Sequence, residues 1–100
     1  MYGLEEKYIE FIKGTIKTYF PDDDIKCYIF GSRAKGEYQE YSDIDIALQL
    51  GDVKISIDKI GQILMAFKDS TLPYEVDVID LNSIDNKFKN IIQDSLIELI

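Results

Sequence analysis

The segment that most constrains the fold is residues 43–50, DIDIALQL, in which apolar and polar side chains alternate strictly. Successive side chains of a β-strand project to opposite faces, so this alternation predicts a strand with one buried and one open face. The open face carries Asp43 and Asp45. Strands disfavour aspartate, and an aspartate is costly to bury without a partner. The two aspartates therefore require a compensating partner.

The rest of the pattern predicts three helices and two further strands. Apolar residues at helical spacing predict helices over residues 4–20 and 55–69 and a last helix around residues 88–92, capped by Asn82 or Ser83. Short runs of β-forming residues predict strands over 25–30 and 74–80. Residues 32–42 predict a turn of helix followed by a loop, and the terminal LIELI segment fits either a helix end or a short strand.

The order helix, strand, strand, helix, strand, helix predicts an α/β (α+β) fold with a small mixed β-sheet and helices packed on one face. The opposite face would remain partly open, and Asp43 and Asp45 would project from it. The chain has 100 residues, which is enough for one domain with a modest core.

Charge and composition limit the classes of function that are open to this chain. The net charge is −8, from 19 acidic and 11 basic residues, which argues against binding a nucleic-acid backbone through the whole surface. Such a balance suits metal cations or a basic protein partner. The absence of histidine excludes Ser-His and Cys-His catalysis. A single cysteine, Cys27, excludes an intrachain disulfide, and no apolar run is long enough to span a membrane, so we expect a cytoplasmic protein.

Three aspartates form the candidate catalytic and metal-binding group. Asp43 and Asp45 project to the same side of one strand, where two anions raise each other's pKa unless a cation intervenes, and Mg²⁺ is the natural cation for such oxygen ligands. Asp77 alternates with Val76 and Val78, so it reaches the same open face if the valines join the core. Three carboxylates suit a two-metal site. An acidic edge strand without a metal is the alternative reading.

Asp80 is the competing third acid. Its spacing places it with Val76 and Val78, and it directly precedes LNS, so we expect a strand-end or capping role for it and favour Asp77 for the site.

The pair Gly31-Ser32 is the candidate nucleotide-binding turn. It ends a predicted strand and begins a turn of helix, so its backbone N–H groups are available to a phosphate. The Ser32 hydroxyl can donate to a phosphate oxygen, and Arg33 and Lys35 could add phosphate contacts. An ordinary turn is the alternative reading of this pair taken alone.

Taken together, these residues resemble a known family. Gly31-Ser32, ten residues and Asp43-Ile44-Asp45 match the G-S-x10-D-x-D signature of the DNA polymerase β-type nucleotidyltransferase superfamily. The strings FGSRAKG, SDIDIAL and VDVIDL resemble its smallest branch, the minimal nucleotidyltransferases (MNT), which include MntA-type antitoxins. The resemblance runs from about Ile25 to Asp94 and implies that residues 1–100 form a single minimal nucleotidyltransferase domain.

The resemblance implies a function and residue roles. Gly31 and Ser32 would hold the triphosphate of ATP, Asp43 and Asp45 would bind two Mg²⁺ ions, and Asp77 would bind one ion and help deprotonate the acceptor. The reaction would be Mg-dependent transfer of AMP to a hydroxyl, expected to be a tyrosine of a HEPN-type toxin ribonuclease, with the chain acting as its antitoxin. Direct nucleic-acid and membrane partners are not expected.

Two alternatives remain open. The chain could neutralise its toxin by stoichiometric binding without catalysis, or it could transfer a nucleotide to a small-molecule hydroxyl. A chain of this length has little room for a nucleobase pocket and an acceptor site together, so a partner or second copy, in a homo- or hetero-oligomer, is expected to complete the site.

Overall fold

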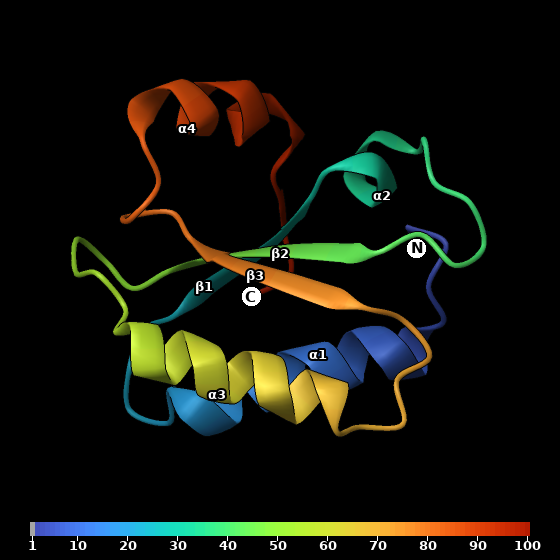
Figure 1. Ribbon diagram of the computed structural model, residues 1–100, viewed down its shortest axis with the longest axis horizontal. Coiled ribbons are helices and arrows are strands. Elements are labelled where there is room, and N and C mark those ends of the chain that lie inside the picture. Colours follow the sequence, from blue (N-terminus) through green and yellow to red (C-terminus); the bar gives the residue numbers. More distant parts are fainter. Residues whose placement is uncertain (1) are drawn as a thin grey trace.

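A four-stranded mixed sheet forms the centre of the computed structural model, which describes residues 2–100 (Figure 1). The strand order is β3-β2-β1-β4; β2 and β3 pair in parallel, and β1 pairs antiparallel with both β2 and β4. The strands are β1 (Lys26–Phe30), β2 (Ile44–Gln49), β3 (Val76–Asp80) and β4 (Ile97–Glu98). The helices are α1 (Glu6–Tyr19), α2 (Ser32–Lys35), α3 (Ile57–Lys68) and α4 (Asn86–Ile92), followed by the 3₁₀ turn η1 (Gln93–Ser95).

The main core lies between the sheet and helices α1 and α3, which cover one face (Figure 1). The strand β2 supplies Ile44, Ile46 and Leu48 to this core, all fully buried. These residues meet the apolar stripe of α1, formed by Ile9, Ile12 and Ile16. The alternation in residues 43–50 therefore has the predicted consequence, and the predicted α/β class with a small mixed sheet is confirmed.

The opposite face differs in part from the expectation that the helices pack on one face only. The helix α4 lies across this face (Figure 1), and its Ile92 joins a second buried cluster with Phe30, Ala47 and Leu81. The reason is that β1 is apolar on both sides: Cys27 and Ile29 enter the main core, whereas Phe30 enters the second cluster. The part of this face around Asp45 and Asp77 remains open.

Two features of the C-terminal part of the chain go beyond the sequence prediction: the predicted helix cap is wrong, and the structure of the last segment, which the sequence left open, is defined. The cap of α4 is Asp85, whose carboxylate accepts a hydrogen bond from the Phe88 N–H at 2.8 Å, and not Asn82 or Ser83. The segment LIELI contains a short strand, β4, which pairs with β1 through Tyr28 and Ile29.

Cys27 is fully buried in β1, and burial raises the pKa of its thiol to about 12. It therefore behaves as a small core residue. Among the helices of residues 2–100, none combines the length and apolar character needed to cross a membrane.

Candidate active site

The three aspartates gather where β2 and β3 lie side by side. Asp45 and Asp77 are directly paired in the parallel register of these strands, and neighbouring strands lie about 4.8 Å apart. Asp43 directly precedes β2, two residues before Asp45. Asp45 is half-buried, whereas Asp43 and Asp77 are exposed to solvent. The structure therefore places the three predicted acids together, on the open part of the second face.

The three aspartates form a site of negative charge that no ion pair within residues 2–100 compensates. Burial raises the pKa of the Asp45 carboxyl, and the negative charges of Asp77 and Asp43 raise it further. In residues 2–100 the ion pairs formed by lysine or arginine involve none of these three aspartates. A bound cation would relieve the repulsion among them.

Mg²⁺ fits this donor set because it prefers carboxylate oxygens. Within residues 2–100, no three His, Cys, Asp or Glu side chains are grouped closely enough to hold a metal ion by themselves. In this arrangement an ion would be held by fewer than three of these carboxylates and would complete its coordination with water or phosphate oxygens, which is the usual way in which Mg²⁺ is bound beside a nucleotide.

Gly31 brings the backbone directly against Asp45. The residue before it, Phe30, is paired with Asp45 across β1 and β2, and Gly31 has φ +75° and ψ −149°. A Cβ atom at Gly31 would lie 2.5 Å from Asp45 Oδ2, so no other residue fits without displacing the carboxylate. Ser32 then begins α2, whose first N–H groups lack intrahelical acceptors, as at any helix start.

Two substitutions separate close approach from backbone strain. We expect Gly31→Ala to destabilise the fold by about 1–3 kcal/mol, because this backbone region is almost closed to other residues, and to displace Asp45. Gly36→Ala is the control for a positive φ without a close contact, since Gly36 has φ +76° and ψ 12°, in the left-handed helical region, and no atom within 4 Å of an added Cβ. Thermal unfolding and Mn²⁺ titration would compare them; equal Mn²⁺ affinity in the two variants would contradict the importance of the Gly31–Asp45 contact.

Arg33 does not occupy the nucleotide-binding position that the sequence predicted. Its side chain is 1% exposed, and its guanidinium donates to the backbone carbonyls of Tyr2, Glu40 and Ser42. The group therefore faces the protein interior, where backbone carbonyls accept its hydrogen bonds. Sequence reasoning missed its partners because they are backbone carbonyls up to 31 positions away, which carry no residue-type signal. Lys35 is exposed at the end of α2.

Asp80 has the structural role expected from its spacing. It is 6% exposed, and its carboxylate accepts hydrogen bonds from the Ile55 N–H at 2.8 Å, the Asn82 N–H at 3.0 Å and the Ser83 hydroxyl at 2.7 Å. These bonds hold the segment before α3 against the end of β3. Asp80 thus lies on the side of the sheet that α1 and α3 cover, apart from Asp77.

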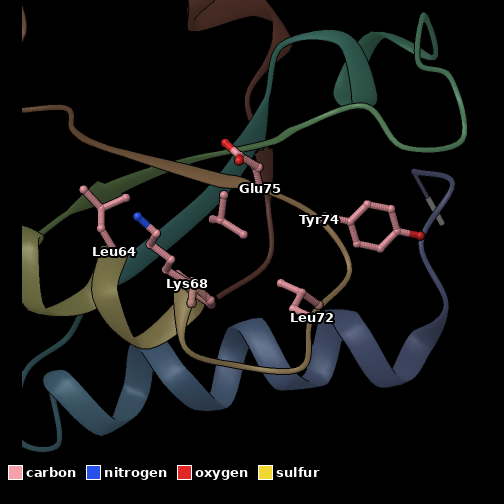
Figure 2. A pocket seen from close by; sticks show the side chains of 7 residues that line it. Leu64, Lys68, Leu72, Tyr74 and Glu75 are labelled. Carbon is pink, nitrogen blue, oxygen red and sulfur yellow. The ribbon is translucent and has the colours of Figure 1, made fainter.

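A pocket of about 280 Å³ lies elsewhere, between the C-terminal end of α3 and the start of β3 (Figure 2). Leu64, Leu72 and Val76 contribute to its lining. Val76 projects toward the main core, whereas Asp77 projects from the opposite face. This pocket is therefore not part of the candidate active site.

A mixed sheet with paired aspartates on adjacent strands and a glycine turn against one of them defines the nucleotidyltransferase class. Residues 12–100 match the family model described as "Polymerase beta, Nucleotidyltransferase". The chain belongs to this family.

Similar proteins come from several organisms. The chain is 28% identical over 90 residues to the probable protein adenylyltransferase MntA of Haemophilus influenzae, covering 90% of this chain and 76% of MntA. It is 36% identical over 72 residues to MJ0435 of Methanocaldococcus jannaschii, which bears a provisional protein adenylyltransferase name; the match covers 72% of this chain and 75% of that protein.

Solved structures share the fold. A mutant form of the MntA–HpeT toxin–antitoxin superposes with a TM-score of 0.74 at 20% identity, over 92% of this chain and 71% of that chain. A complex of tri-AMPylated Shewanella oneidensis HEPN toxin with MNT antitoxin gives 0.74 at 22% identity, over 97% and 72%. A toxin–antitoxin with AMP-PNP gives 0.69 at 23% identity, over 88% and 72%.

Proposed function

We propose that this protein transfers AMP from ATP to a hydroxyl group of a HEPN-type toxin ribonuclease and thereby acts as its antitoxin. The observation that carries the proposal is the contact set around Asp45, which has Asp77 beside it in register and the Gly31 backbone against its carboxylate. Family membership and two relatives named as protein adenylyltransferases support the reaction type.

Each site residue has a role in this proposal. Gly31 and Ser32 bind the phosphates of ATP through the backbone N–H groups of the turn and the Ser32 hydroxyl. Asp43, Asp45 and Asp77 hold two Mg²⁺ ions, which when bound neutralise the phosphate charge. The acceptor oxygen forms a bond to the α-phosphorus, the bond from that phosphorus to the bridging oxygen breaks, and pyrophosphate leaves. Asp77, which is exposed, accepts the proton of the acceptor hydroxyl.

The acceptor protein and the cellular compartment also belong to this proposal. A solved structure with the same fold contains an AMPylated HEPN toxin, which supports such a toxin as the acceptor here. The family resemblance implies that the acceptor hydroxyl belongs to a tyrosine. A net charge of −8 suits a basic ribonuclease surface. The site lies open on the sheet, so the partner itself would complete it. A single buried cysteine suits a reducing compartment such as the cytoplasm.

Neutralisation of the partner toxin tests the catalytic proposal against stoichiometric binding. We expect ribonuclease activity to disappear when the toxin is preincubated with this protein, Mg²⁺ and ATP. With the ATP analogue whose α,β-bridging oxygen is replaced by methylene, pyrophosphate cannot leave and the ribonuclease should stay active. Equal neutralisation with the analogue, or without nucleotide, would show that binding alone silences the toxin.

A further inference from the structure

We propose that Arg33 is a positioning residue, which fixes the Gly31-Ser32 turn relative to Asp43 and the start of β3. The inference rests on the proposed function for its catalytic consequence and on contacts in this chain for its structural part. Arg33 is the second residue of α2, directly after the turn that would hold the phosphates.

The strongest contacts of Arg33 are with the loop that leads to Asp43. Its Nε and Nη2 atoms donate to one acceptor, the Ser42 carbonyl, at 3.0 and 2.8 Å. Nη2 also donates to the Glu40 carbonyl at 3.3 Å. Because Ser42 immediately precedes Asp43, the guanidinium sets the position of this metal-binding candidate relative to α2.

A second set of Arg33 contacts extends to the N-terminal segment and to two tyrosine rings. Nη1 donates to the Tyr2 carbonyl at 2.9 Å, and the guanidinium carbon lies 5.3 Å from the Tyr38 ring centroid and 4.8 Å from that of Tyr74. Gly3 packs closely on Tyr38, since a Cβ there would overlap with the ring. The guanidinium is thus held on several sides.

Tyr74 connects Arg33 to the strand that carries Asp77. Figure 2 shows the Tyr74 ring projecting from the segment before β3 toward the N-terminal segment. The next residue, Glu75, accepts a hydrogen bond at its carbonyl from the Ile44 N–H at 2.9 Å. Arg33 therefore contacts the segments leading into both strands of the aspartate site.

The chemistry of these contacts requires a guanidinium group. In residues 2–100 no carboxylate forms an ion pair with Arg33, so its buried charge is balanced by carbonyl dipoles and aromatic faces. A planar fork can bind one carbonyl with two nitrogens and stack on rings at once, whereas a lysine ammonium cannot. Arg33→Lys should therefore keep the charge and lose the alignment.

The experiment measures AMP transfer, Mn²⁺ affinity and amide hydrogen exchange in full-length Arg33→Lys. We expect faster exchange at residues 40–44, weaker Mn²⁺ binding, and kcat lowered about 100-fold with a smaller change in the KM for ATP, because a misplacement of about 1 Å is enough for such a loss. In Arg33→Ala, added guanidinium ion should restore part of kcat. Tyr38→Leu, which keeps Arg33, should change amide exchange, Mn²⁺ affinity and kcat in the same directions as Arg33→Lys, but by smaller amounts.

Two control variants separate positioning from general destabilisation. Ile16→Val lowers stability in the core on the other side of the sheet and should leave kcat unchanged. Lys35→Met changes an exposed cation of the same helix and should neither lose Mn²⁺ affinity nor respond to guanidinium. Wild-type Mn²⁺ affinity and exchange in Arg33→Lys would overturn the inference, as would faster exchange with unchanged kcat. Absence of transfer by the wild type would instead refute the proposed function, and Mn²⁺ affinity and exchange would still decide the role of Arg33.

Discussion

Asp45→Asn is expected to lower AMP transfer by about a thousandfold, the upper range for loss of one group that stabilises transition-state charge. The substitution removes the carboxylate that lies between Asp77 and the Gly31 backbone, and with it the central ligand that we propose for Mg²⁺. For the wild type we expect Mg²⁺ to raise the melting temperature, and the same variant should lose this rise. Labelled-ATP assays and thermal unfolding with and without Mg²⁺ measure the two effects.

In metal-free solution the same variant should be more stable than the wild type at neutral pH. The pKa of Asp45 is raised in the folded state, first by burial and then by Asp77 and Asp43, so ionisation costs folding free energy. This cost is present above the ordinary aspartate pKa and absent below about pH 4, where the carboxyl is protonated in both states. The gain from Asp45→Asn should therefore disappear as the pH is lowered. Transfer at the wild-type rate, or destabilisation at pH 7 in EDTA, would contradict this description of the site.

Asp80→Ala is expected to have the opposite profile, with a loss of about 1–3 kcal/mol in the free energy of unfolding, the cost of leaving a buried hydrogen-bond donor without its acceptor. The substitution removes the acceptor of the buried Ile55 N–H and of the partly buried donors of Asn82 and Ser83. Stability of a small domain is about 5–15 kcal/mol in total, so the loss would be a large fraction of it. Urea unfolding monitored by circular dichroism measures the change.

Asp77→Ala is the matched control, because Asp77 is an exposed aspartate of the same strand. We expect it to retain wild-type stability and to lose transfer. A stable Asp80→Ala variant would show that the network is dispensable, and an unstable Asp77→Ala variant would show that Asp77 is a structural residue.

The sequence predicts the sheet well where one side of a strand is buried and the other is not. The alternation around β2 places Ile44 and Ile46 in the core and Asp45 opposite, and parity then places Asp77 beside it. Such patterns are readable because burial acts on every second side chain. The same parity correctly separates Asp80 from the site.

The sequence does not predict features that depend on long-range contacts to the backbone. Arg33 follows the turn that we propose to bind phosphate, so the sequence suggested a phosphate contact for this cation, whereas its side chain donates to backbone carbonyls. The cap of α4 is Asp85 because the chain after β3 first forms a turn in which Asp80 holds Asn82 and Ser83. The position of α4 on the second face depends on Phe30 and Ala47, whose burial no single-strand pattern revealed.

The central claim is tested most directly by incubating the purified protein with Mg²⁺, its partner toxin and labelled ATP. The label is placed on the α-phosphate in one experiment and on the γ-phosphate in the other. Nucleotidyl transfer predicts that label from the α-position becomes covalently attached to a tyrosine of the toxin, while label from the γ-position is released as pyrophosphate. The Asp77→Ala variant should bind the toxin without labelling it. Attachment of the γ-label, or toxin that remains unlabelled from the α-position while it is silenced, would contradict the account.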